Sequence, residues 1–164
     1  MSEGGASWGG LAEERPDLAE GGRDLLYRFG VGLGFLATVR RDGGPRVHPV
    51  CPILHDGDLY LLVIPSPKRD DLLRDRRFAL HSFPTDDDED AFALTGTAEP
   101  VDDAAVREGV IAVFLRERPT LRIEADELDA QRLFVCRLRS CLLTRTDGYG
   151  DPHPRHQIWR SPEI

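Results

Sequence analysis

The stretch that decides the fold spans residues 59–74 and reads LYLLVIPSPKRDDLLR. Its first six residues, 59–64, form an apolar run that stops at Pro65, a pattern typical of a buried strand. Ser66 is a preferred N-cap residue, and Pro67 suits the first position of a helix, where no backbone N–H is needed. The sequence therefore predicts a buried strand that leads directly into a helix.

The start of that helix is a candidate anion site. Lys68 and Arg69 would lie in its first turn, where cations oppose the positive end of the helix dipole. A bound anion would offset that repulsion, because free backbone amides, the Ser66 hydroxyl and two cations would converge on it. From local chemistry alone, a phosphate site and a solvated helix start with two exposed cations are about equally good interpretations.

Alternating apolar residues predict further strands around this unit. Pro49 and Pro52 interrupt one of these strands or place it at a sheet edge, and Gly96 predicts a bulge or a close approach in another. Hairpin-linked strands precede the inserted helices, so the order predicts an antiparallel sheet that is closed or nearly closed into a barrel. The predicted strands are 34–40, 46–54, 59–64, 77–83, 91–99, 132–145 and a short 157–160, and the predicted helices are 23–29, 67–76, 103–118 and 124–130.

Length and composition describe a single domain. The chain has 164 residues, and we expect residues 1–22, which are rich in glycine, to be flexible and residues 23–164 to form the domain. A net charge of −8 argues against a general nucleic-acid or anionic-membrane binder. No apolar run approaches the length of a membrane span, and no signal peptide is evident, so we expect a cytoplasmic protein.

Cysteines and acidic residues indicate no metal centre or disulfide framework. Three cysteines form no regular pattern, and Cys136 and Cys141, five residues apart on a predicted strand, should face opposite sides of a sheet. The acidic run 86–90 is typical of a solvated loop. Asp151, His153 and His156 have only loose ligand spacing.

Three segments together resemble the pyridoxamine 5'-phosphate oxidase-like, FMN-binding split-barrel superfamily. They are residues 34–50 (GFLATVRRDGGPRVHPV), 59–80 (LYLLVIPSPKRDDLLRDRRFAL) and 92–98 (FALTGTA), which are similar to its opening hairpin, its strand–helix–strand unit and its following strand. The resemblance implies a mainly β domain with flanking helices, built on a six-stranded antiparallel split β-barrel with Greek-key topology. It also implies a homodimer with a flavin-type cofactor in each of two grooves at the dimer interface.

The resemblance also implies which residues hold the cofactor. The superfamily's phosphate-binding positions fall on Arg46, Ser66 and Lys68, and Arg69 is a helper by position. Its contacts to the flavin ring are largely from backbone, and they fall on Val47, His48, Pro49, Val50, Leu62 and Val63. No catalytic side chain is expected, because the flavin itself carries out the chemistry.

Two late residues and one histidine have open roles on this mapping. His48 is the titratable residue nearest the ring, and an edge-strand histidine without a catalytic task is its more frequent interpretation. Trp159 either stacks on the partner subunit's cofactor or packs within its own chain, and Arg160 lies beside it in sequence.

The implied activity is that of an FMN-dependent oxidoreductase, in which hydride moves through flavin N5 to or from a small molecule. The true pyridoxamine phosphate oxidases have an Arg-x-His motif near the C-terminus, whereas Arg155 and His156 are adjacent here, which argues against vitamin B6 oxidation. Two alternatives stay open. One is an F420-dependent reductase, which would need a longer basic groove. The residues that could form this groove for F420 are Lys68, Arg69, Arg74, Arg76 and Arg77. The other alternative is a non-catalytic flavin- or haem-binding protein.

Overall fold

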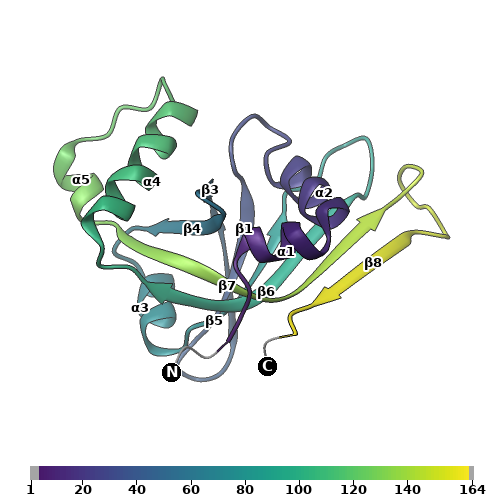
Figure 1. Cartoon of the computed structure of the whole chain (residues 1–164), viewed down its shortest axis with the longest axis horizontal. Helices are drawn as coiled ribbons and strands as arrows, with labels where there is room; N and C mark the ends of the chain where they lie inside the picture. Colours follow the sequence, from purple (N-terminus) through teal and green to yellow (C-terminus); the bar gives the residue numbers. More distant parts are fainter. Residues whose placement is uncertain (1–3, 163–164) are drawn as a thin grey trace.

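A single antiparallel sheet carries the fold in the computed structural model, which describes residues 4–162 (Figure 1). Its eight strands are β1 (Gly34–Val39), β2 (Pro45–Val50), β3 (Pro52–His55), β4 (Asp58–Val63), β5 (Arg77–Ser82), β6 (Ala91–Pro100), β7 (Arg132–Arg145) and β8 (Arg155–Arg160). The helices are α1 (Trp8–Glu14), α2 (Pro16–Leu26), α3 (Pro67–Arg74), α4 (Ala104–Glu117) and α5 (Ala125–Asp129). Each predicted strand from the sequence has a counterpart, most of them within two residues at either end.

The sheet is curled into a barrel with a split. Seven strands follow the order β2-β1-β5-β6-β7-β4-β3, and β8 pairs with the C-terminal part of β7. Cys51 alone separates β2 from β3 in the chain, yet these strands lie at opposite ends of the order. The sheet must therefore curve until its two ends meet at Cys51.

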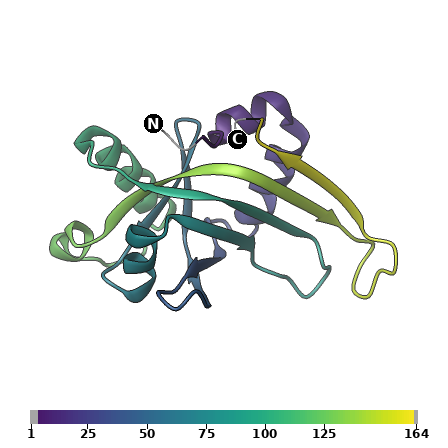
Figure 2. The same ribbon diagram turned by 90° about the horizontal axis from the view of Figure 1, so that it is seen from below.

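The expected count of six strands was wrong. The stretch 46–54 does not form one strand but two, because the strand is interrupted at Cys51, between the end of β2 at Val50 and the start of β3 at Pro52. The short strand predicted at 157–160 is β8, which is also additional to the six strands that the resemblance implies. It forms a hairpin with β7, and Figure 2 shows this hairpin projecting beyond the rest of the molecule. The broader expectation, a mainly β antiparallel split barrel with flanking helices, is confirmed.

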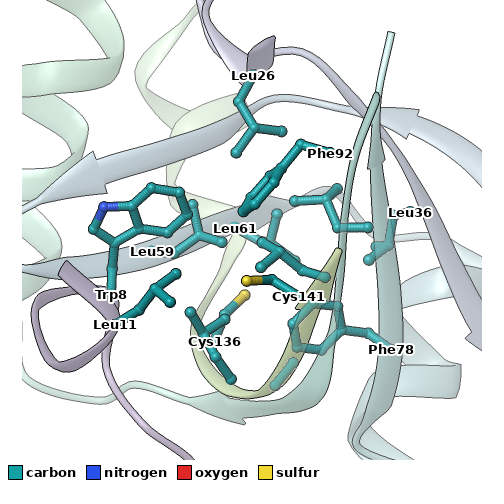
Figure 3. Close-up of a cluster of buried hydrophobic side chains, with 14 of the residues drawn as sticks. Trp8, Leu11, Leu26, Leu36, Leu59, Leu61, Phe78, Phe92, Cys136 and Cys141 are labelled. Atoms are coloured by element: carbon teal, nitrogen blue, oxygen red, sulfur yellow. The ribbon is translucent and has the colours of Figure 1, made fainter. Parts of the chain in front are cut away.

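A β-bulge changes the alternation of β7. Residue Thr95 is opposite Ser140, but Gly96 is opposite Leu138, so Arg139 has no partner on β6. This extra residue places Cys136 and Cys141 on the same face, where both are buried in the core (Figure 3). The prediction that these cysteines face opposite sides was therefore wrong, whereas the bulge predicted at Gly96 is confirmed.

Two N-terminal helices cover the curled sheet. Of residues 1–22, which we expected to be flexible, residues 8–14 lie in α1, residues 16–22 lie in α2, and residues 1–3 are outside the described part of the chain. Trp8, Leu11 and Leu18 are buried in the main core, and the Trp8 ring meets the Phe92 ring edge to face (Figure 3). These apolar residues are too sparse among glycines to stand out in the sequence, yet they close the core on one side of the sheet.

The remaining helices border the other strands. Side chains of α4 form a second core with β3, β4 and the start of β7, and Asp103 caps α4 by accepting hydrogen bonds from the amides of Ala105 and Val106. No helix among residues 4–162 is long and apolar enough to cross a membrane. The cytoplasmic location stays a prediction.

Candidate functional site

The N-terminus of α3 follows the end of β4, as the sequence predicts. Ser66 occupies the N-cap position with an extended backbone, and Pro67 is the first helical residue. The Ser66 hydroxyl does not cap the helix, because its Oγ donates a hydrogen bond to the carbonyl oxygen of Ile64 at 2.8 Å. The start of α3 therefore has no side-chain acceptor, and an external anion can take that place.

A lysine and an arginine lie on one side of this helix start. Lys68 is half-buried and has no hydrogen bond or ion pair with any residue in the described range 4–162. It precedes Asp71 by three residues, so the two share a face of α3. Asp71 accepts a hydrogen bond at 2.7 Å from Nε of Arg46 on β2. The contact brings two of the predicted phosphate residues, Arg46 and Lys68, to the same face of the helix.

Asp71 organises this side of the site. Its side chain is buried, with 3% of the residue exposed, and it also accepts hydrogen bonds from Thr38 Oγ1 at 2.9 Å and from Arg74 at 3.3 Å. Burial by itself would raise the pKa of Asp71, but the hydrogen bonds from Arg46, Thr38 and Arg74 outweigh it and hold the pKa below its ordinary value. Asp71 is therefore ionised at neutral pH and fixes the Arg46 guanidinium through Nε.

The predicted ring-binding residues lie where the sheet is not closed. β2 pairs with β1 only, so its other edge is free within the described chain, as its prolines predict. β3 pairs with residues 58–61 of β4, which leaves Leu62 and Val63 unpaired on that side. The side chains of Val47 and Pro49 are exposed, those of His48, Val50 and Leu62 are half-buried, and that of Val63 is buried. Both backbone segments thus border the split, which α3 spans from the end of β4 to Arg46.

Arg69 lies apart from the other predicted residues. Its guanidinium donates a long hydrogen bond of 3.3 Å to the carbonyl oxygen of Ala130, just after α5. It lines a pocket of about 310 Å³ together with Arg107 and Arg132, and none of the other predicted cofactor residues lines this pocket.

The basic groove expected for F420 is partly neutralised. Arg74 bonds to Asp71 and to the carbonyl oxygen of Val39. Arg77 bonds to Asp75 at 2.7 Å and holds the pKa of that carboxyl at about 2. Among the expected groove residues, only Lys68, Arg69 and Arg76 have no ion pair with a described residue.

Other candidate residues serve the structure itself. Trp159 is buried in its own core and donates from Nε1 to Glu14 at 2.8 Å, so its packing interpretation is confirmed. In the acidic run 86–90, Asp88 is paired with Arg28 and Asp90 with Arg145. No group of three or more His, Cys, Asp or Glu side chains within residues 4–162 could hold a metal ion.

Sequence reasoning missed Asp71 and Thr38. Their role depends on long-range packing, because Thr38 is on β1 and Asp71 on α3. The one local signal was an aspartate at the third position after Lys68, which could have been recognised as lying on the same helical face.

Comparison with known proteins supports a fold and no narrower family. A scan against known protein families finds no match. An alignment over 69 residues shows 35% identity to protein lin-28 homolog B of Mus musculus, but it covers 37% of this chain and 28% of that protein, too little to assign a family.

Solved structures give a consistent likeness over most of the chain. A heme binding protein from Mycobacterium smegmatis has a TM-score of 0.63 at 21% identity, covering 89% of this chain and 59% of that one. An F420 reductase has a TM-score of 0.59 at 20% identity, covering 73% and 94%. A Clostridium acetobutylicum protein related to general stress protein 26 of B. subtilis, of the pyridoxinephosphate oxidase family, has a TM-score of 0.57 at 14% identity, covering 93% and 95%. The protein therefore has the split-barrel fold of the pyridoxamine 5'-phosphate oxidase-like superfamily.

Proposed function

We propose that the protein binds FMN, with the phosphate at the start of α3, and acts as an FMN-dependent oxidoreductase. The observation that carries this proposal is the uncapped N-terminus of α3 beside an unpaired lysine and an arginine that is held in place by Asp71. Structures of the same fold include proteins named for F420 reduction and for the pyridoxinephosphate oxidase family, which favours a flavin-type cofactor.

The residues present fit such a cofactor. Lys68 and the backbone amides of α3 would hold the phosphate, and the terminal amino groups of Arg46, which make no hydrogen bond with a described residue, would complete its shell. Free backbone at the edge of β2 and at Leu62 and Val63 would orient the ring and exclude water from it. When bound, the flavin supplies hydride transfer at N5. The three cysteines are free, which suits the reducing cytoplasm that we propose as the compartment.

We propose further that two copies assemble through the outer face of the sheet. Strand pairing aligns six residues in a row across β2, β1, β5, β6, β7 and β8, and we call this row the outer belt: Pro49, Phe35, His81, Ala93, Leu142 and Ile158. Phe35 is 36% exposed and Ile158 is 56% exposed, and the neighbouring Val47 on the same face is 59% exposed. The row is apolar except for His81, and exposed apolar side chains gathered in this way favour a contact site, which a second copy would cover together with the adjacent edge of β2.

The charges on α3 and just after it favour FMN over F420. The single phosphate of FMN needs a compact site, whereas the longer groove expected for F420 has lost Arg74 and Arg77 to ion pairs. Haem needs an axial ligand. His48 is the one histidine among the predicted ring-binding residues, so a haem complex at that site would depend on it rather than on Lys68.

The experiment is a titration of FMN with the protein, in which binding is monitored by the quenching of flavin fluorescence. Lys68→Ala should weaken FMN binding by about tenfold or more, because it removes a charge-assisted contact to the phosphate. Arg76→Ala is the matched control: Arg76 is exposed, has no ion pair with a described residue, and lies outside the helix, so its loss should change the affinity by less than about twofold. Unchanged affinity in Lys68→Ala would contradict the phosphate assignment, and haem binding that survives Lys68→Ala and fails in His48→Ala would replace FMN with haem.

A further inference from the structure

A second cluster of cations surrounds the pocket that Arg69 enters. The pocket has a volume of about 310 Å³ and lies between α3, α4, the end of α5 and the start of β7. Arg69 comes from the first turn of α3, Arg107 from α4 and Arg132 from β7. Because Arg132 pairs with Val63 at the end of β4, the pocket lies beside the β4–α3 connection.

The three arginines differ in how fully they are bonded. Arg107 is fixed, since it donates to the carbonyl oxygens of Gln131 at 2.9 Å and Leu128 at 2.7 Å and so holds the C-terminal end of α5. In Arg69 and Arg132, by contrast, Nε is buried and has no hydrogen-bond partner among the described residues. Native proteins rarely leave a buried N–H without a partner, so the guanidinium groups of Arg69 and Arg132, which both line the pocket, lack part of their hydrogen bonding within the described chain.

The charge around the pocket indicates which class of ligand could complete this hydrogen bonding. Three arginines face two carboxylates, those of Asp102 and Asp129, in the lining of the pocket. Asp102 already bonds to Arg132 at 2.7 Å, and its side chain is 81% exposed, so solvent screens it. The remaining excess of positive charge, presented by planar guanidinium groups, favours an oxyanion over a cation or a neutral group.

We propose that this pocket is a second anion site, which takes a carboxylate or phosphate group through Arg69 and Arg132. It is distinct from the flavin phosphate site at Lys68, and it assigns Arg69 to a different ligand from the one the sequence predicts. A volume near 310 Å³ is at the lower end of ligand pockets, so the site suits a small acid or one acidic group of a larger molecule.

The test follows the arginine Nε–Hε signals of the flavin-free protein by ¹H–¹⁵N NMR. Sodium phosphate and sodium malonate are titrated separately, with sodium chloride at matched ionic strength as the control. The Nε–Hε signals of Arg69 and Arg132 should shift in a saturable way with one or both oxyanions and not with chloride. A stronger response to phosphate identifies a phosphate group as the ligand, and a stronger response to malonate identifies a carboxylate.

Variants separate this site from the flavin site. Arg132→Gln should weaken the oxyanion response of Arg69 by about tenfold, and Arg69→Gln should do the same to Arg132. Arg139→Gln is the matched control, because Arg139 is exposed on the same strand and has no ion pair with a described residue. Lys68→Ala should leave the response unchanged even where FMN binding is lost. Signals that respond equally to chloride, or do not saturate, would overturn the second site whatever the outcome of the FMN titration.

Discussion

Asp71 is the residue on which the geometry of the candidate site depends. It is the buried acceptor that joins β1, β2 and α3 through Thr38, Arg46 and Arg74. Removing a hydrogen-bonded charge from a buried network leaves its partners unsatisfied, so the change acts on both stability and ligand binding. Lys68, in contrast, has no hydrogen bond or ion pair with a residue in the described range 4–162, so its replacement should affect binding alone.

Asp71→Asn should lower the free energy of unfolding by about 1–3 kcal/mol at pH 7, measured by urea denaturation. The folded-state pKa of Asp71 is lowered, so ionisation of Asp71 stabilises the protein above the unfolded pKa of about 3.9. This contribution is lost as the pH falls through the folded pKa. The difference between the two proteins should therefore be constant above about pH 5 and shrink below about pH 4.

Asp70→Asn is the control for this measurement, because Asp70 is exposed and has no ion pair with a described residue. It should change stability by less than about 0.5 kcal/mol. An Asp71→Asn loss as large at pH 3 as at pH 7 would show that packing, and not the ionised carboxylate, accounts for the effect.

At the scale of residues, the sequence predicted where the residues of the helix start lie better than it predicted their hydrogen-bond partners. Lys68 and Ser66 could be placed at the start of a helix from local pattern alone. The hydroxyl of Ser66 nevertheless donates to the carbonyl oxygen of Ile64, and the Arg69 side chain donates to the carbonyl oxygen of Ala130 after α5. Both side-chain orientations depend on the local fold, which a pattern of residue types does not show.

At the scale of elements, the bulge between β6 and β7 determines which side chains reach the core. Arg139 is the extra residue, and it allows Cys136, Leu138, Cys141 and Leu143 all to be buried. Gly96 makes the close approach possible, since a Cβ on it would lie 2.0 Å from the carbonyl oxygen of Arg137. Strict alternation cannot detect such a change of phase. Gly96 indicated a bulge from the sequence, but it did not indicate that Arg139 on the partner strand would be the extra residue.

Gly96→Ala should therefore lower the free energy of unfolding by about 2 kcal/mol or more, measured by thermal or urea unfolding. The contact is with backbone, which cannot rotate away as a side chain does. Gly10→Ala in α1 is the matched control, because its new Cβ would come no closer than 3.5 Å to another heavy atom, and it should be neutral or stabilising by up to about 1 kcal/mol. Equal losses in the two variants would contradict the role of the bulge.

At the scale of the whole molecule, the chain order of the strands predicts a barrel, and the break at Cys51 explains why it is split. The sequence could not predict how α1 and α2 close the core, since Trp8, Leu11 and Leu18 are separated by glycines and charges. Nor could it show that six strands align side chains into the outer belt, because that alignment depends on register.

The outer belt leads to a prediction about assembly. The protein should sediment as a dimer, and Ile158→Glu should raise the dimer dissociation constant by at least about tenfold, because it places an unpaired charge in an apolar contact. Leu121→Glu is the control, since Leu121 is 42% exposed in the segment after α4, away from the belt. A wild-type protein that stays monomeric, or equal effects of the two substitutions, would contradict this interface.

The FMN titration of the wild-type protein tests most directly whether the N-terminus of α3 binds a flavin phosphate. We predict saturable quenching of flavin fluorescence with one FMN bound per chain, and retention of the flavin through gel filtration with its visible absorption bands. Failure of FMN to saturate or to be retained, under conditions in which the protein is folded, would contradict the assignment of the α3 N-terminus as a flavin phosphate site.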